Sequence, residues 1–176
     1  MTRLQGRPGH NRGRKLPAEI LTADEVRRLI RATNRGDTGA RNRALIAVMY
    51  RAGLRLSEAL ALKPSDVDTA AGTIRVLHGK GDRARTVGID EGACAIIEAW
   101  MTRRGKRGFR NGRLFCNLDG TPMSPNAVRE MLRRAAEKAG IEKRVHPHGL
   151  RHAHAAELLR EGINARLIQQ QLGHAN

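Results

Sequence analysis

The stretch His146-Pro147-His148-Gly149-Leu150-Arg151-His152, followed by a helical pattern that ends at Leu172-Gly173-His174, gathers a possible proton acceptor, cations and phosphate donors. His148 and Arg151 are three residues apart, so a helix from Gly149 onward would place both side chains on one side of its first turn. The backbone amides of a first turn also favour an anion. The stretch therefore predicts a site for a phosphate group.

The charge of the chain points to a polyanionic partner. Its 176 residues include 33 Lys and Arg against 17 Asp and Glu, which gives a formal net charge of +16 and an isoelectric point near 11.5. For a small chain this balance favours nucleic acid, with double-stranded DNA as the expected partner. On charge alone, a merely solvated, arginine-rich surface is the alternative.

The length and the 40% share of hydrophobic residues predict one domain with a substantial core. The aromatic residues are few, namely Tyr50, Trp100, Phe109 and Phe115. The core is therefore expected to be aliphatic, and stacking of bases on aromatic side chains is disfavoured as a binding mode.

The two cysteines and the absence of targeting patterns bear on the compartment. Cys94 and Cys116 lie far apart without metal-ligand or redox spacing, and the sequence shows no signal peptide or long apolar run. We expect a reducing, cytoplasmic environment and two buried free thiols, with a disulfide as the alternative.

Residues 1–17 form a basic segment with little to bury. Its cations are Arg3, Arg7, Arg12, Arg14 and Lys15, spaced among glycines. This composition predicts a flexible arm, which could follow a DNA backbone, be the remainder of a linker, or have no specific task. Residues 18–176 are expected to form the single folded domain.

Local signals predict helices in the first part of this domain. Thr22 and Glu25 make a capping box for a helix that should end near Gly36. Residues 41–52 have apolar side chains at helical spacing and stop at Gly53, a natural helix terminator.

The middle of the chain predicts a short helix and a hairpin. Ser57 is expected to cap the helix, with Arg55 at the junction just before it. Residues 73–78 and 84–89 alternate like strands around a glycine-rich turn, which places Lys80 at the tip of a hairpin.

Further helices are expected over residues 91–103 and from Ser124-Pro125 to Gly140, with a brief strand at residues 114–116 between them. Together these elements predict an α+β fold that is mainly helical and carries a small antiparallel sheet.

Five segments carry a resemblance to a known family. They are Leu21-Thr22-Ala23-Asp24-Glu25-Val26, Ala52-Gly53-Leu54-Arg55-Leu56-Ser57-Glu58, Gly79-Lys80-Gly81, His148-Gly149-Leu150-Arg151-His152 and Leu172-Gly173-His174. Each segment alone is a weak signal, but their order and structural contexts make the set specific. The chain resembles the catalytic domain of the tyrosine recombinase, or phage integrase, family, here without its C-terminal end.

This resemblance implies DNA strand cleavage and rejoining through a 3′-phosphotyrosine intermediate, in site-specific recombination or integration. Arg55 and Arg151 would hold the non-bridging oxygens of the scissile phosphate, because planar guanidinium groups match that geometry. His174 would add a hydrogen bond, and Glu58 would support its neighbours.

The resemblance also assigns the proton transfers. His148 would act as proton acceptor or phosphate donor, and Lys80 would protonate the departing 5′-oxygen. No metal and no cofactor are expected, because cations of the protein take the part of a divalent ion. A zinc site at His148 and His152 is the weaker alternative, because the sequence offers no carboxylate or cysteine ligand nearby.

The attacking tyrosine of the family would fall beyond Asn176. We interpret Tyr50, the one tyrosine of the sequence, as a packed core residue with a satisfied hydroxyl. A partial chain, a nucleophile from another subunit and a loss of chemistry are the open explanations. The alternatives in function are a catalytically silent DNA-binding or regulatory module and a type IB topoisomerase-like activity. The family implies a tetramer on paired DNA sites and a monomer in isolation.

Overall fold

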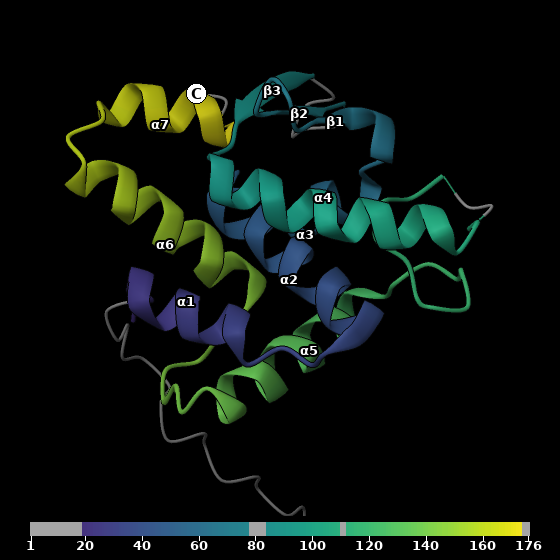
Figure 1. Ribbon diagram of the computed structural model, residues 1–176. Helices are drawn as coiled ribbons and strands as arrows, with labels where there is room; N and C mark the ends of the chain where they lie inside the picture. The colour runs from purple at the N-terminus through teal and green to yellow at the C-terminus, as the bar shows by residue number, and fades with distance from the viewer. Residues whose placement is uncertain (1–18, 78–83, 110–111, 174–176) are drawn as a thin grey trace, which may run out of the picture.

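The computed structural model describes residues 19–77, 84–109 and 112–173. Along this part of the chain, three helices precede a small sheet and four helices follow it (Figure 1). In order they are α1 (Ala23–Arg31), α2 (Gly36–Arg51), α3 (Leu56–Ala61), the 3-10 turn η1 (Pro64–Asp66), β1 (Val67–Asp68), β2 (Thr73–Val76), β3 (Arg85–Gly88), α4 (Glu91–Lys106), α5 (Pro125–Lys138), α6 (Pro147–Arg160) and α7 (Ala165–Leu172).

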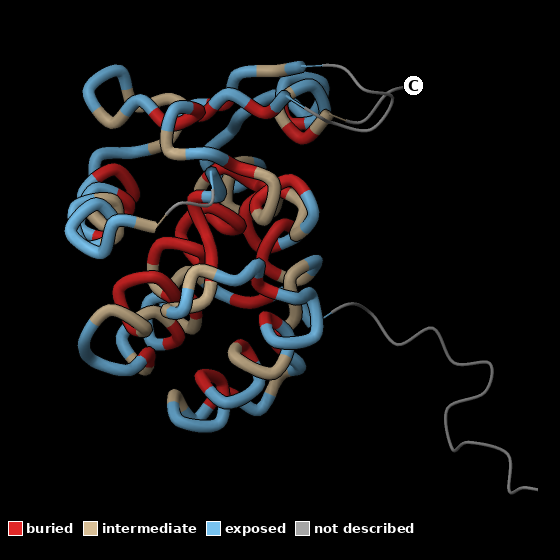
Figure 2. Tube along the Cα trace, turned by 90° about the vertical axis from the view of Figure 1, so that its right-hand side faces the viewer, coloured by how far each residue is buried: buried red, intermediate tan, exposed pale blue. Residues whose placement is uncertain are grey.

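Helix α2 lies at the centre of the fold and is buried on nearly every side. It packs against α1, α3, α4 and α6. Leu45, Ile46 and Met49 are fully buried on it, and the buried part of the trace in Figure 2 runs through this region. The second half of α2, residues 44–50, is apolar on all sides and is stable only inside a protein, so the other helices surround it. The loop that follows α2 is thereby held against the core.

The predicted N-termini of two helices are confirmed. The Thr22 hydroxyl accepts from the Glu25 amide, and the Glu25 carboxylate accepts from the Thr22 amide, which completes the capping box of α1. Ser124 caps α5 by accepting from the Ala127 amide, with Pro125 at the first helical position. These local signals therefore place the starts of both helices correctly.

The predicted end of the first helix is wrong. Helix α1 ends at Arg31, and Gly36, with a φ of 75°, opens α2 instead of ending α1. Helix α2 consequently starts five residues before the expected Arg41. The Thr33 hydroxyl donates to the Ile30 carbonyl and takes up a group that the end of α1 leaves unpaired.

The cap of α3 also differs from the prediction. Arg55, not Ser57, is the capping residue, with extended backbone angles of −68° and 153°. Its amide donates to Glu58 Oε2 at 2.8 Å, so Glu58 closes the first turn from within. The consequence is that Arg55 is fixed at the junction between α2 and α3.

The sheet is antiparallel with strand order β1-β2-β3. In the β2–β3 hairpin, Ile74 pairs with Val87 and Val76 pairs with Arg85. The tip of this hairpin, with Lys80, lies outside the described residues. The sequence did not indicate β1, and the strand expected at residues 114–116 is only an isolated bridge between Cys116 and Pro122.

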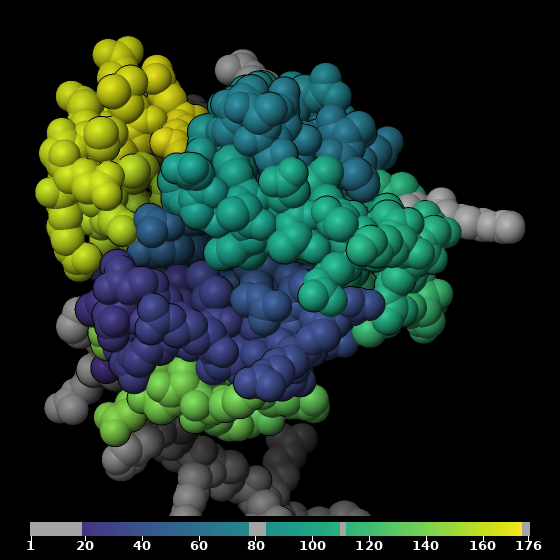
Figure 3. Space-filling model, in the orientation of Figure 1, coloured from purple at the N-terminus to yellow at the C-terminus, as the bar shows by residue number. Residues whose placement is uncertain are grey.

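In Figures 1 and 3, α5 lies below the core and α6 and α7 lie on its left side, whereas α4 packs against α2. Helix α4 extends past the expected residue 103 to Lys106, and α6 begins at Pro147. The mainly helical class with a small antiparallel sheet is confirmed.

Cys94 and Cys116 are buried free thiols, as expected. Among the described residues, none of the helices has the length and apolarity needed to cross a bilayer.

Candidate active site around Glu58

The turn between α2 and α3 brings Arg55 to the edge of the core. Gly53 reverses the chain with a φ of 61°, and Leu54 anchors the turn by complete burial. Arg55 follows with 30% of its side chain exposed. Its Nη1 donates to Glu58 Oε1 at 2.8 Å, and its Nη2 donates to the Gly173 carbonyl at 3.4 Å. Arg55 is thus oriented but remains accessible.

Glu58 is the centre of the polar cluster. Its side chain is only 2% exposed and accepts from the backbone and side chain of Arg55. Arg85 of β3 adds a fork, with Nη1 to Oε1 at 3.0 Å and Nη2 to Oε2 at 2.9 Å. Burial alone would raise the pKa of Glu58, but the hydrogen bonds from Arg85 and Arg55 outweigh it, and the pKa is lowered. Glu58 is therefore held as a carboxylate.

Sequence reasoning missed Arg85. The residue lies on the basic strand that follows the Gly79-Lys80-Gly81 turn, which was the only local signal. Its side chain, 14% exposed, reaches Glu58 across 27 positions of sequence. Such a long-range ion pair has no signature in local spacing.

Arg151 reaches the same cluster from the first turns of α6. The residue is 4% exposed, and its Nη1 donates to the Gly53 carbonyl at 2.6 Å. Its Nη2 donates to the Leu172 carbonyl. Burial, followed by the nearby positive charge of Arg55, lowers the pKa of Arg151 to about 10. At neutral pH it is a buried cation that two backbone carbonyls hold in place.

Three arginines converge on the C-terminal end of α7. Arg85 Nε donates to the Gln171 carbonyl at 3.0 Å, and Arg151 and Arg55 bond the Leu172 and Gly173 carbonyls. The last carbonyls of a helix have no intrahelical partner and carry the negative end of its dipole, so cations are favoured there. Gly173, with a φ of 65°, ends α7 where the sequence predicted a helix end, but the expected continuous helical pattern is divided into α6 and α7.

The histidines line the start of α6. His146 caps the helix, because its Nδ1 accepts from the Gly149 amide at 3.1 Å. The rings of His148 and His152 meet edge to face with centroids 4.2 Å apart. Burial lowers the pKa of His148, and electrostatic repulsion from neighbouring basic side chains lowers it further. A neutral imidazole at this place could accept a proton or donate a hydrogen bond.

The expectation that Tyr50 is a packed, satisfied aromatic is confirmed. Tyr50 is 3% exposed, and its hydroxyl donates to Glu157 of α6. Burial and this carboxylate raise the pKa of Tyr50, which disfavours the phenolate. Arg51 stacks over the ring at 4.8 Å and pairs with Glu157 at 3.1 Å. The hydroxyl therefore serves the packing of α2 against α6.

The structure places four of the six proposed site residues. Arg55, Glu58 and Arg151 form one cluster, and His148 lies close enough for the charges of Arg55 and Arg151 to affect its pKa. Lys80 and His174 lie outside the described residues. Within the described ranges, there is no group of three side chains that could hold a metal ion.

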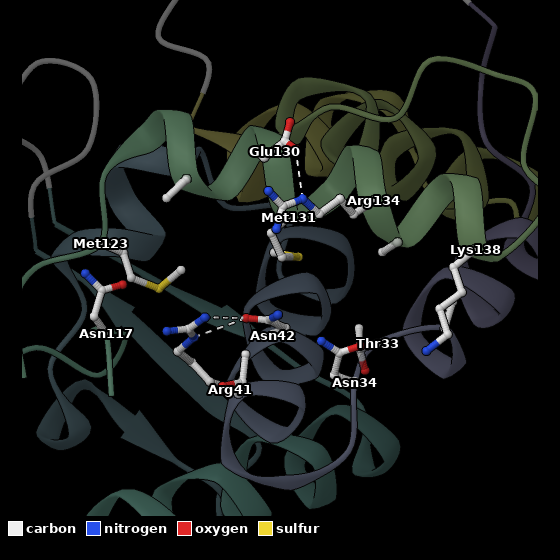
Figure 4. A pocket seen from close by; sticks show the side chains of 14 residues that line it. Thr33, Asn34, Arg41, Asn42, Asn117, Met123, Glu130, Met131, Arg134 and Lys138 are labelled. Atoms are coloured by element: carbon white, nitrogen blue, oxygen red, sulfur yellow. Dashed lines mark hydrogen bonds and ion pairs between the residues drawn. The ribbon is translucent and has the colours of Figure 1, made fainter. Parts of the chain in front are cut away.

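A separate cavity of about 470 Å³ lies near the start of α2 and along α5 (Figure 4). Arg41 and Asn42 form its floor, and Glu130, Arg134 and Lys138 of α5 lie along its rim. The part of α2 that follows Asn42 separates this cavity from the Gly53 turn, which lies beyond the C-terminal end of the helix. The cavity is therefore not part of the arginine cluster.

The sequence and the fold both match known proteins. The model of the phage integrase family matches residues 19–176. The chain belongs to this family. The integrase domain is 39% identical over 172 residues to the tyrosine recombinase XerC of Halalkalibacterium halodurans, covering 93% of this chain and 56% of that protein. It is 38% identical to the tyrosine recombinase XerD of Mycobacterium leprae, with coverages of 93% and 55%.

Solved structures agree with this assignment. The crystal structure of XerA recombinase superimposes with a TM-score of 0.84 at 36% identity, over 93% of this domain and 58% of that chain. The XerH site-specific recombinase in a post-cleavage complex with palindromic difH substrate gives 0.76 at 30% identity, with coverages of 92% and 48%. A lambda integrase dimer on a core site, at 20% identity and a TM-score of 0.69, shares the fold. The chain spans about half the length of the curated relatives it matches.

Proposed function

We propose that this integrase domain holds a DNA phosphodiester for strand cleavage and rejoining at specific sites. The observation that carries the proposal is the convergence of Arg55, Arg85 and Arg151, from three distant segments, around Glu58 and the end of α7. Guanidinium groups in a partly buried cluster suit the negative charge that develops on a phosphate in its transition state. The net charge of +16 would guide DNA to the cluster.

Arg55 and Arg151 would donate to the non-bridging oxygens. Arg55 is accessible, and each guanidinium has more N–H groups than the bonds described above use. His148, whose pKa is lowered, would take the proton of the attacking hydroxyl or donate to the phosphate. Glu58 would keep Arg55 oriented through two hydrogen bonds.

The other roles rest on the family pattern. Lys80 would protonate the leaving 5′-oxygen, and His174 would add a hydrogen bond to the phosphate. The attacking tyrosine is expected after residue 176 and would store the bond energy in a 3′-phosphotyrosine link. The proposed partner is double-stranded DNA, with a tetramer on paired sites and a monomer in isolation. The proposed location is the cytoplasm of a bacterium or of a phage-infected host cell.

A suicide substrate tests the proposal. The target site is first selected from a random duplex library by binding, and a nicked copy is then offered to the full-length protein. A covalent protein–DNA adduct on a denaturing gel is the expected result, and Tyr50→Phe should leave it unchanged, because the Tyr50 hydroxyl is engaged with Glu157. Relaxation of a plasmid without the selected site would instead favour the topoisomerase-like activity. Binding without any adduct would overturn the proposal in favour of a silent DNA-binding module.

A further inference from the structure

Arg85 binds the Glu58 carboxylate in a bidentate manner. Both its terminal nitrogens donate to the carboxylate, at 3.0 and 2.9 Å, while its Nε donates to the Gln171 carbonyl. All three nitrogens of the guanidinium thus have partners inside the protein, and 14% of the side chain is exposed. Arg85 is therefore built into the wall of the site, which leaves Arg55, with 30% of its side chain exposed, to face a phosphate.

The position of Arg85 links three parts of the site. It lies on β3, which leads back from the Lys80 turn, and it contacts α3 through Glu58 and α7 through Gln171. A methyl group built at Gly173 would come within 3.2 Å of the guanidinium, so the glycine lets the end of α7 lie directly against Arg85. A shift of Arg85 would therefore move strand β3, the Arg55 turn and the end of α7 relative to one another.

The charges of the cluster give Arg85 a second task. Arg55, Arg85 and Arg151 carry three positive charges, and Glu58 carries one negative charge. Without Arg85, the buried carboxylate would have Arg55 as its only side-chain partner among those described, and their charges would offset each other. With Arg85 in place, both arginines share the negative charge of Glu58, so the positive charge of Arg55 is only partly offset and remains available to a phosphate.

We propose that Arg85 is a positioning residue of the proposed phosphate site: it neutralises Glu58 so that Arg55 can bind phosphate, and it fixes strand β3 against the end of α7. This inference rests on the proposed function, because it takes Arg55 to be a phosphate ligand. Arg85 acts through Glu58 and the Gln171 carbonyl and does not touch DNA.

The charge part is tested with this chain and non-specific duplex DNA, without any reaction. Arg85→Met is expected to reduce the slope of log affinity against log salt by about 0.9, the value for one phosphate that the protein no longer neutralises. Adding Glu58→Gln should restore that slope, because the double variant has the same local net charge as the wild type. Arg103→Met, which removes one positive charge from α4, is the matched control and should keep the wild-type slope.

The positioning part is tested with the full-length protein and the suicide substrate at saturating DNA. Arg85→Lys keeps the charge beside Glu58 but cannot make the fork, so it should bind with the wild-type slope and form adduct about tenfold more slowly. Circular dichroism and thermal unfolding verify that each variant is folded. If Arg85→Met does not fold, Arg85→Gln takes its place in the same cycle with Glu58→Gln.

The outcomes separate the inference from the proposed function. Additive losses in the double variant, or wild-type adduct formation by Arg85→Lys, would overturn the role of Arg85 while leaving the recombinase proposal intact. Loss of binding that Glu58→Gln reverses would support the charge role even if the wild type formed no adduct. Absence of DNA binding by the wild-type chain would overturn both.

Discussion

Among the single residues of the fold, Arg41 stands out as a buried cation. It is 8% exposed, and in the described part of the chain its three guanidinium nitrogens donate to the Asn42 side-chain oxygen and the Cys116 carbonyl (Figure 4). Burial lowers its pKa. An amide oxygen offsets a buried positive charge less well than a carboxylate would, so a stronger acceptor at position 42 could raise the free energy of unfolding.

We therefore predict that Asn42→Asp stabilises the domain. A carboxylate oxygen in the place of the amide oxygen gives the Arg41 cation an ionised acceptor in both bonds, which should raise the free energy of unfolding by about 1 kcal/mol at pH 7. Urea denaturation measures the change. Asn34→Asp, an exposed substitution on the rim of the same cavity, is the control for adding a negative charge to a basic chain. A gain no larger than that of the control would contradict the prediction.

His154 is a second buried polar residue, and its burial should make the free energy of unfolding depend on pH. It is 4% exposed, and its Nε2 lies 3.4 Å from Gln171 Nε2. Burial lowers the pKa of His154 to about 4, whereas an unfolded histidine titrates near ~6.5. Between these values the unfolded chain binds a proton that the folded chain does not, so stability falls as the pH drops from about 6.5 to about 4.

Replacing this histidine should remove part of the acid sensitivity. We predict that His154→Phe loses on the order of 2 kcal/mol less than the wild type between pH 7 and pH 4.5. Urea denaturation at the two pH values measures this difference, and the pH 7 values of each protein serve as its own reference. Equal losses for both proteins would show that His154 is protonated in the folded state without cost.

Among the elements, the turn at Gly53 controls how closely α7 docks. A methyl group built at Gly53 would lie 2.6 Å from Leu172 Cδ2 and 2.7 Å from His154 Cδ2. The φ of Gly53 is 61°, close to the 63° of Gly140, but nothing lies within 4 Å of a methyl group at Gly140. The two glycines therefore share the backbone requirement and differ in the space around them.

The pair allows strain and crowding to be separated. Gly140→Ala should reduce the free energy of unfolding by about 1 kcal/mol, because alanine is strained in the left-handed conformation. Gly53→Ala should cost about 2 kcal/mol more, because Leu172 and the buried His154 ring must move. Denaturation gives the two costs, and hydrogen exchange in α7 should rise for Gly53→Ala alone. Equal losses of unfolding free energy in the two variants would mean that Leu172 and His154 move aside without a measurable cost.

The elements also show what the sequence could predict. The caps at Thr22 and Ser124 are local patterns, and both helices were placed by them. The start of α2 was missed because Gly36 resembles a terminator and the residues up to Ala40 lack apolar periodicity. Strand β1 has two residues, too few to show alternation. Local sequence signals therefore could not predict the boundaries that tertiary packing determines.

In the molecule as a whole, the site was predictable only in part. Arg55, Glu58 and Arg151 could be named because each lies in a motif, and the fold brings them together. Arg85 could not, because its role depends on contacts with Glu58 and Gln171 that join distant segments. Lys80 and His174 stay predictions. Motifs thus identify groups that act on a ligand, whereas the groups that position them emerge from the fold.

The positive charge of the whole chain includes a basic first segment. Residues 1–15 carry five Lys and Arg and no acidic residue. If these cations neutralise DNA phosphates, deleting the segment should weaken binding equally for all duplex sequences and lower the salt slope by about 0.9 for each phosphate that is no longer neutralised. Titrations of two unrelated duplexes at several salt concentrations measure both effects. Because Arg55 and Arg151 lie on the folded domain, adduct formation at saturating DNA should be unaffected. An unchanged salt slope would show that the segment takes no part in binding.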